Sequence, residues 1–138
     1  MKLVISDTNI IIDLLNIDLL DIFLQLPIEI HTTDLVVSEL KDEQAKLIMK
    51  KVTEGKMLLN TANEEEYAEI LEISKEKQSI SLVDFSVYYF ANKIKATILT
   101  GDKAFRNYNM IQTIYTKKRL YCYFVGKLST VIFDPPSE

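Results

Sequence analysis

Short apolar segments rich in β-branched residues alternate along the chain with longer segments of helical periodicity. The first short segment, KLVIS, is typical of a buried strand. Strands are expected at residues 2–6, 28–32, 56–60, 96–100 and 120–125. Helices are expected at residues 9–26, 35–52, 64–77, 81–94 and 103–118, with Asp34 as the cap of the second. This alternation predicts an α/β protein with a parallel sheet covered by helices on both faces.

The length of 138 residues suits one domain, and no linker, repeat or low-complexity segment divides residues 1–138. No basic amino-terminal region precedes an apolar segment with a small-residue cleavage site, and Asp13, Asp18 and Asp21 interrupt the longest apolar region. These features predict neither a signal peptide nor a membrane span. The single cysteine, Cys122, excludes an internal disulfide framework and favours the cytoplasm.

Charge is distributed unevenly along a chain whose net charge is −4. Residues 1–92 contain 8 basic and 17 acidic side chains, whereas residues 93–127 contain 8 basic side chains and one acid, Asp102. The acidic total disfavours indiscriminate binding of nucleic acid, but the basic region could attract a polyanion. The alternative is that these basic side chains only solvate a helix face.

Four carboxylates are expected at the edge where the parallel strands end. Asp7 follows the first strand directly, and Asp102 follows the fourth. Asp84 falls in the first turn of the fourth helix, and Glu39 lies early in the second. In open parallel sheets, ligands bind beyond the carboxyl ends of the strands. We call Asp7, Glu39, Asp84 and Asp102 the acidic quartet and treat it as the candidate site.

Each member of the acidic quartet also has a purely structural interpretation. Asp7 could cap the helix that follows it. Asp84 could complete a capping box with Ser81, and Asp102 could be a turn residue. Glu39 is one glutamate among many. Each of these interpretations is reasonable for a single residue. Together, however, they do not explain why four acids are expected at the same edge of the sheet.

Crowded carboxylates repel one another, so they persist where a cation or protons neutralise them. Oxygen ligands without imidazole or thiolate select Mg²⁺ or Mn²⁺ over zinc. Such ions lower the pKa of an attacking water and polarise phosphoryl oxygens. The acidic quartet therefore predicts a Mg²⁺ or Mn²⁺ site suited to phosphodiester hydrolysis.

Three motifs occur in order along the chain: DTNIIIDLL from Asp7, VVSELKDE around Glu39, and SLVDFSVYYFANKIKATILTGDKAF over residues 81–105. In this ordered set the chain resembles the PIN-domain ribonucleases, especially the VapC-type toxins of toxin–antitoxin pairs. The resemblance implies a PIN-like three-layer sandwich with a parallel central sheet of about five short strands and helices on both faces.

The resemblance further implies metal-dependent hydrolysis of phosphodiester bonds in single-stranded RNA, with the acidic quartet as catalytic and metal-binding residues. Asp7 and Asp102 are expected to hold the principal ion. Asn9 and Thr100 are expected to support the site through hydrogen bonds to the carboxylates. An antitoxin protein and a second copy of the chain are the implied partners.

Basic and aromatic residues follow Asp102. We expect contacts with RNA from Lys103, Arg106, Lys117, Lys118 and Arg119; the alternative is that these charges are only solvated. Phe105 is expected in the core, and either Tyr108 or Tyr115 is expected to be exposed, where it could stack on a base. His31 lies in an expected strand and is interpreted as structural.

Other functions compete with hydrolysis of RNA. A haloacid-dehalogenase-like phosphatase would need an acid two positions after Asp7, where the chain has Asn9. A response-regulator receiver would need paired acids before its phosphorylated aspartate, and no acid precedes Asp7. A PIN-like module that binds RNA or protein without cleaving it remains the alternative to the nuclease.

Overall fold

The computed structural model describes the backbone of residues 2–116 and 122–124 and the side chains of residues 2–109. Five parallel strands form one sheet with the order β3-β2-β1-β4-β5. The strands are β1 (Lys2–Ser6), β2 (Ile28–Thr33), β3 (Leu58–Asn60), β4 (Thr97–Thr100) and β5 (Cys122–Phe124). The helices are α1 (Thr8–Asn16), α2 (Leu20–Phe23), α3 (Asp34–Glu39), α4 (Asp42–Thr53), α5 (Glu64–Ser74), α6 (Leu82–Ile94) and α7 (Lys103–Thr116).

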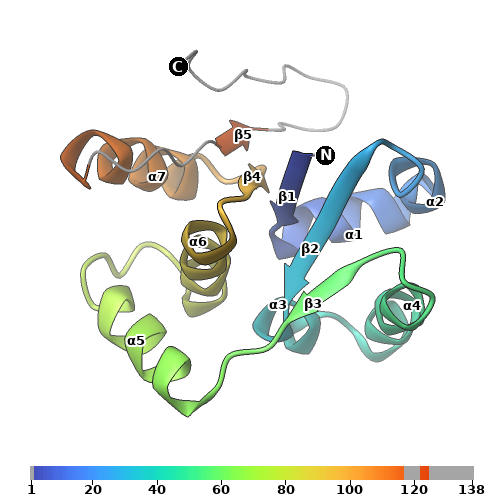
Figure 1. Cartoon of the computed structure of the whole chain (residues 1–138), viewed down its shortest axis with the longest axis horizontal. Coiled ribbons are helices and arrows are strands. Elements are labelled where there is room, and N and C mark those ends of the chain that lie inside the picture. Colours follow the sequence, from blue (N-terminus) through green and yellow to red (C-terminus); the bar gives the residue numbers. More distant parts are fainter. Residues whose placement is uncertain (1, 117–121, 125–138) are drawn as a thin grey trace.

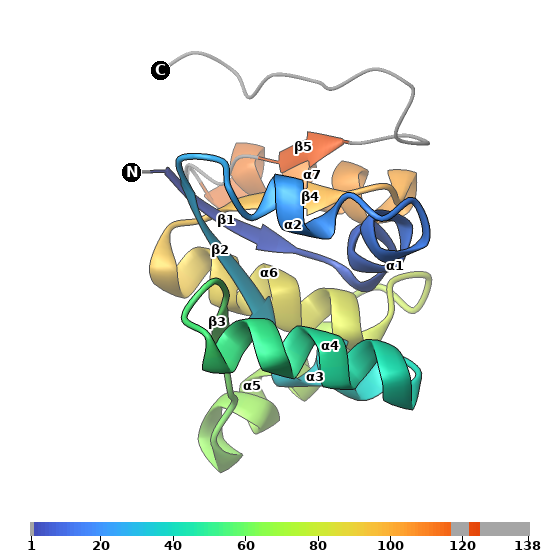
Figure 2. The same cartoon turned by 90° about the vertical axis from the view of Figure 1, so that its right-hand side faces the viewer.

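The helices lie on both sides of the sheet, as the alternation of elements predicts. The chain runs from β1 through β2 to β3 in one direction, then returns past β1 to β4 and β5. Right-handed crossovers therefore place α1, α2 and α4 on one side and α6 and α7 on the other. Figure 1 shows this division, and Figure 2 looks at the sheet from the side of α1, α2 and α4. The predicted three-layer α/β sandwich is confirmed.

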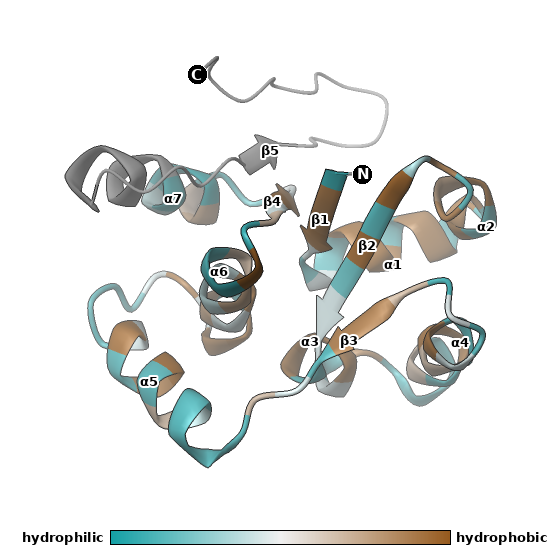
Figure 3. Ribbon diagram, viewed as in Figure 1, coloured by the Kyte–Doolittle hydropathy of each residue, from teal (hydrophilic) through white to brown (hydrophobic). Residues whose placement is uncertain are grey.

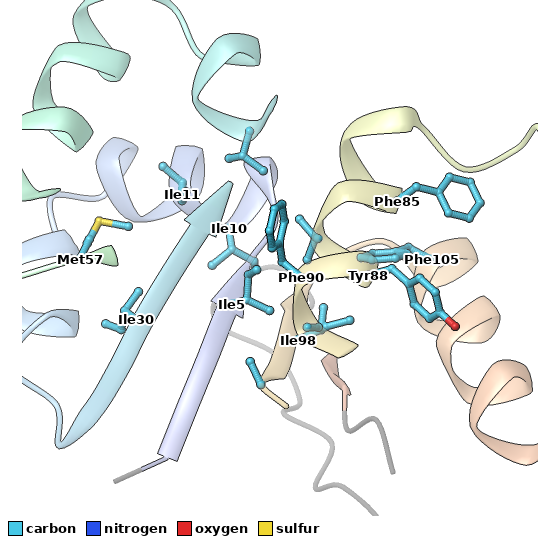
Figure 4. Close-up of a cluster of buried hydrophobic side chains, with 14 of the residues drawn as sticks. Ile5, Ile10, Ile11, Ile30, Met57, Phe85, Tyr88, Phe90, Ile98 and Phe105 are labelled. Atoms are coloured by element: carbon cyan, nitrogen blue, oxygen red, sulfur yellow. The ribbon is translucent and has the colours of Figure 1, made fainter. Parts of the chain in front are cut away.

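The hydrophobic core fills the space between the sheet and its helices. Ile5 of β1 and Ile98 of β4 are adjacent in the sheet register and completely buried. Phe85 and Phe105, also completely buried, fill the space between α6 and α7 (Figure 4). Figure 3 shows α4 and α5 with both hydrophilic and hydrophobic residues, as expected of helices that cover a core. None of the helices in the described residues is long and apolar enough to cross a membrane.

The prediction of a single helix at residues 9–26 is wrong, because α1 ends at Asn16 and a separate helix, α2, begins at Leu20. Asp18 takes a left-handed conformation with φ of 58°. The amide of Leu19 donates to the Leu14 carbonyl oxygen at 2.9 Å, and this bond is typical of a Schellman motif. An aspartate tolerates the left-handed region better than most residues, so Asp18 ends the helix where no glycine or proline signals it.

The helix expected at residues 35–52 is also two helices, because Leu40 and Lys41 are extended between α3 and α4. Leu40 is buried, so the break turns an apolar side chain into the core. The predicted cap is wrong as well: the Thr33 hydroxyl, one residue before Asp34, accepts the Val36 amide at 3.1 Å.

Candidate functional site

The sheet reverses its direction of growth at β1. The chain goes from β1 to β2 on one side, whereas β4 pairs with β1 on the other. Such a reversal leaves a crevice at the carboxyl ends of the two central strands. Asp7 follows β1 and donates its amide to the Leu99 carbonyl oxygen of β4 at 3.1 Å. Asp102 follows β4 after a single glycine.

Asp7 is held in a fixed orientation although it is nearly completely buried, with 2% of its surface exposed. Its Oδ1 accepts the Ile10 amide at 3.0 Å and so caps α1. Its Oδ2 accepts a hydrogen bond from the Thr100 hydroxyl. Asp7 therefore caps α1, and it also accepts the hydrogen bond expected from Thr100. The two bonds use different oxygens of the carboxylate, so both form at once.

Asp102 is fixed by the same threonine. The Thr100 hydroxyl oxygen accepts the Asp102 amide at 3.0 Å. The Asp102 carboxylate caps α7, because its Oδ1 accepts the amides of Ala104 at 2.8 Å and Phe105 at 3.2 Å. Its second oxygen, Oδ2, takes no part in the cap. Thr100 thus forms hydrogen bonds with both Asp7, which follows β1, and Asp102, which follows β4.

Asp84 lies in the first turn of α6, where the Ser81 hydroxyl accepts its amide at 3.1 Å. Burial raises the pKa of Asp84 to about 7, and the negative charges of Asp7, Asp102 and Glu39 add to this shift. Burial likewise raises the pKa of Asp7 to about 6, with a smaller contribution from the charge of Asp102. Asp84 therefore lies close enough to the other three carboxylates for each of them to repel its charge.

Glu39 is the outermost member of the acidic quartet. It is the last residue of α3 and is exposed. Among the described residues, no three acidic, histidine or cysteine side chains are gathered tightly enough to hold an ion as they stand. The oxygen-only donor set and the mutual repulsion nevertheless fit a divalent cation, since a cation would remove the cost of the shared charge.

The residues expected to support the site or to bind RNA differ in their exposure to solvent. Asn9 is exposed on α1, and no hydrogen bond joins it to a carboxylate of the described residues. Lys103 is exposed in the first turn of α7, and Arg106 is partly buried one turn later. Lys117, Lys118 and Arg119 lie outside the described residues.

Of the two rings of which one was expected to be exposed, Tyr108 is buried, with only 4% of its surface accessible. Its ring packs edge-on against Phe85 and Tyr88, with centroids 5.2 Å apart in both pairs. Tyr108 is therefore a core residue and cannot stack on a base. Phe105 is completely buried, as predicted. The side chain of Tyr115 lies outside the described residues.

His31 is a structural residue, as its position in β2 predicts. Its Nε2 lies 2.7 Å from Glu29 Oε1, and its Nδ1 lies 3.0 Å from Asn60 Nδ2. Asn60 Nδ2 also donates to the Thr32 carbonyl oxygen at 3.1 Å. These bonds tie β2 to β3.

A buried contact between Thr33 and Ser86 was not predicted from the sequence. Their hydroxyl oxygens lie 2.9 Å apart and join the start of α3 to α6. This bond fixes the helix that carries Glu39 against the helix that carries Asp84. The available signal is a small polar residue two positions after Asp84 in an otherwise apolar helix.

The fold and the acids define the class of protein: a parallel α/β sandwich with carboxylates at the switch point of its sheet. A family model described as a PIN domain matches residues 3–117. The chain therefore belongs to the PIN-domain family. A comparison with curated proteins gives no match.

Two solved structures share the fold. One is a chain of VapBC2 from Rickettsia felis, in a crystal structure bound to a DNA fragment from their promoter. It is 18% identical with a TM-score of 0.50, and the match covers 76% of this chain and 92% of that chain. The other is a domain of a functionally unknown protein from Methanocaldococcus jannaschii, 19% identical with a TM-score of 0.55. That match covers 100% of this chain and 97% of that domain.

Proposed function

We propose that this PIN-domain protein is a metal-dependent endoribonuclease that hydrolyses phosphodiester bonds in single-stranded RNA. The observation that carries the proposal is the electrostatic coupling of the acidic quartet. Four elements each supply one acid, and the pKa of Asp84 is raised to about 7 partly by the other three charges. Structural caps alone do not require such repulsion, whereas a cation site uses it.

The acidic quartet would hold Mg²⁺ or Mn²⁺, which supplies Lewis-acid polarisation of a phosphoryl oxygen and an activated water when bound. Asp7 and Asp102 are the best-oriented ligands, since Thr100 and the two helix starts fix their carboxylates. Asp84 and Glu39 would supply the remaining carboxylates. Lys103, which is exposed next to Asp102 in the sequence, would contact an RNA phosphate.

The proposed biological role is that of the toxin in a toxin–antitoxin pair, acting in the cytoplasm as a homodimer. Support comes from the family and from the fold shared with the VapBC2 chain. The proposed partner is an antitoxin encoded beside this chain. Co-expression with that neighbour should relieve growth arrest caused by this chain alone, and arrest that persists in a stable complex would contradict this role.

A cleavage assay tests the nuclease directly. Single-stranded RNA labelled at its 5′ end is incubated with the protein and Mn²⁺ or Mg²⁺, with and without chelator. We expect cleavage that requires the metal and is lost in Asp84→Asn. Asp42→Asn, an exposed acid of α4 outside the acidic quartet, is the matched control and should cleave like the parent.

The competing function is a module that binds RNA or protein without cleaving it. RNA binding without cleavage in every metal tested would support this alternative. Equal binding by the parent and by Asp84→Asn in Mn²⁺ would further separate it from the nuclease.

A further inference from the structure

A row of hydrogen bonds joins the start of α3 to α6. The Thr33 hydroxyl oxygen accepts the Val36 amide at 3.1 Å and lies 2.9 Å from Ser86 Oγ. The Ser86 hydroxyl in turn donates to the Val83 carbonyl oxygen. Because a hydroxyl group has a single hydrogen and that of Ser86 is directed at Val83, Thr33 is the donor in the bond between the two side chains. The direction of every bond in the row is therefore fixed.

The central bond of this row is shielded from solvent. Thr33 and Ser86 are both completely buried, with 0% of their surface exposed. A buried hydroxyl that loses its partner is unfavourable, because no water molecule can replace that partner. The bond between Thr33 and Ser86 therefore constrains the relative position of α3 and α6 more strongly than a bond at the surface would.

Each of the two helices joined in this way carries one acid of the acidic quartet. Asp84 lies in the first turn of α6, two residues before Ser86. Glu39 is the last of the six residues of α3, about 9 Å along the helix from Thr33. The charge of Glu39 is one of the contributions that raise the pKa of Asp84. The two carboxylates therefore interact electrostatically across the contact between α3 and α6.

Glu39 depends on the position of its helix more than Asp7 and Asp102 do. The carboxylates of those two acids accept backbone amides, whereas no hydrogen bond within the described residues fixes the exposed carboxylate of Glu39. The apolar side chains that α3 and the residue after it bury, Val36 and Leu40, stabilise the helix without directing it, because hydrophobic contact is non-directional. The bond to Ser86 supplies a directional contact.

We propose that the Thr33–Ser86 bond positions Glu39 relative to Asp84 and thereby sets the affinity of the acidic quartet for a divalent cation. This inference rests on the proposed function, in which the four acids share a metal site. Ser86 acts through α3 and touches neither the ion nor the substrate, so it is a positioning residue. Residues that orient metal ligands typically change metal affinity by about 10–100-fold when they are replaced.

Calorimetric titration with Mn²⁺ at pH 8, without RNA, measures metal affinity separately from cleavage. Ser86→Ala removes the partner of Thr33 and leaves the cap of α3 in place. Thr33→Ser keeps the hydroxyl and thus the whole row of bonds. Thr32→Val is the matched control, since Thr32 is equally buried and its hydroxyl has no hydrogen-bond partner in the part of the chain that the structure describes.

We expect Ser86→Ala to bind Mn²⁺ at least about tenfold more weakly than the parent, with Thr33→Ser and Thr32→Val within about twofold of it. Glu39→Gln should weaken binding by a similar factor. The double variant Ser86→Ala/Glu39→Gln should bind no more weakly than Glu39→Gln alone, because the serine then has no charged ligand to position. A purely structural serine would lower stability and leave the affinity of the folded protein unchanged.

The outcomes that would overturn this inference differ from the one that would overturn the proposed function. Unchanged affinity in Ser86→Ala, or an equal loss in Thr32→Val, would exclude the positioning role while the metal site stands. Losses that multiply in the double variant would exclude it too, because Ser86 would then act by a route other than Glu39. A parent that shows no saturable binding of Mn²⁺ would overturn the proposed metal site, and the positioning role with it.

Discussion

The Thr100 hydroxyl donates a hydrogen bond to Asp7 Oδ2 while its oxygen accepts the amide of Asp102. Thr100 is the last residue of β4, and Asp7 follows β1, which is the neighbouring strand. The hydroxyl of one completely buried residue therefore fixes the positions of two acids of the candidate site relative to each other. A residue at this position acts on the site through the carboxylates rather than by direct contact with a substrate.

Thr100→Val should lower the free energy of unfolding by about 1–3 kcal/mol, because it leaves a buried carboxylate and a backbone amide without their shared partner. Urea denaturation measured at pH 8 without divalent metal checks this. Thr100→Ser keeps the hydroxyl and should lose less. Equal stability of the Val and Ser variants would show that the hydroxyl does not hold Asp7.

Asp102→Asn should abolish metal-dependent cleavage while the fold remains intact. An asparagine oxygen can still accept the amides of Ala104 and Phe105, so the cap of α7 survives. Mn²⁺ should raise the melting temperature of the parent and have much less effect on the variant. Asp102→Ala removes the cap too and should cost about 1 kcal/mol more. Equal stabilisation of parent and Asn variant by Mn²⁺ would contradict the metal site.

Tyr108→Leu should lower the free energy of unfolding by about 2–4 kcal/mol, because it removes a buried ring and the hydroxyl bond to Glu76. Its affinity for RNA should stay within about twofold of the parent's, since a stacked ring would contribute about 1–3 kcal/mol per base. Filter binding under conditions where the variant is folded separates the two effects. A large loss of affinity would mean that the ring does reach RNA.

The order and type of the elements could be predicted because the apolar periodicity follows the buried faces. The two helix breaks could not. Gly55, with φ of 77°, ends α4 where a glycine signals it. Asp18 and Lys95 adopt the same left-handed conformation, both with φ of 58°, without that signal. The local sequence around Leu40 is compatible with a continuous helix. The break there depends instead on the burial of the Leu40 side chain in the core.

The positions of the acids relative to the strand ends could also be predicted, because parallel strands bring their carboxyl ends to one edge. The depth of each acid could not. Asp7 is buried directly after β1, whereas Glu39 is exposed at the end of α3. The burial of Asp7 depends on tertiary contacts such as its hydrogen bond with Thr100, which is 93 residues away in the sequence.

Lys95→Gly should raise the free energy of unfolding by about 0.5–1 kcal/mol. Lys95 is exposed, and its left-handed conformation strains any residue with a Cβ atom. The amide of the next residue, Ala96, donates to the Ala91 carbonyl oxygen at 2.9 Å and requires this conformation. Gly55→Ala should have the opposite sign, because its φ is also positive. Chemical denaturation of both variants checks the pair, and a destabilised Lys95→Gly would contradict the explanation.

The contribution of Asp84 and Asp7 to the stability of the metal-free protein should fall as the pH rises from about 4 to about 7. Burial and neighbouring charges raise the pKa of Asp84 to about 7 and that of Asp7 to about 6, from 3.8 in both cases. The folded state thus binds these protons more tightly than the unfolded state does. The stabilisation is complete below the unfolded pKa and is lost as the pH rises through the folded pKa.

The contribution of Asp84 is best measured as a difference between variants, because other carboxylates titrate in the same range. Each pKa unit corresponds to about 1.4 kcal/mol, and part of the shift is shared with Asp7. Asp84→Asn should therefore be more stable than the parent by about 1–3 kcal/mol at pH 8 and by much less at pH 4. Asp42→Asn, the exposed control, should show no such divergence. Mg²⁺ should reduce the gap at pH 8, since it neutralises the parent's charges. Parallel stability curves for parent and Asp84→Asn from pH 4 to 8 would mean that the acids do not repel one another.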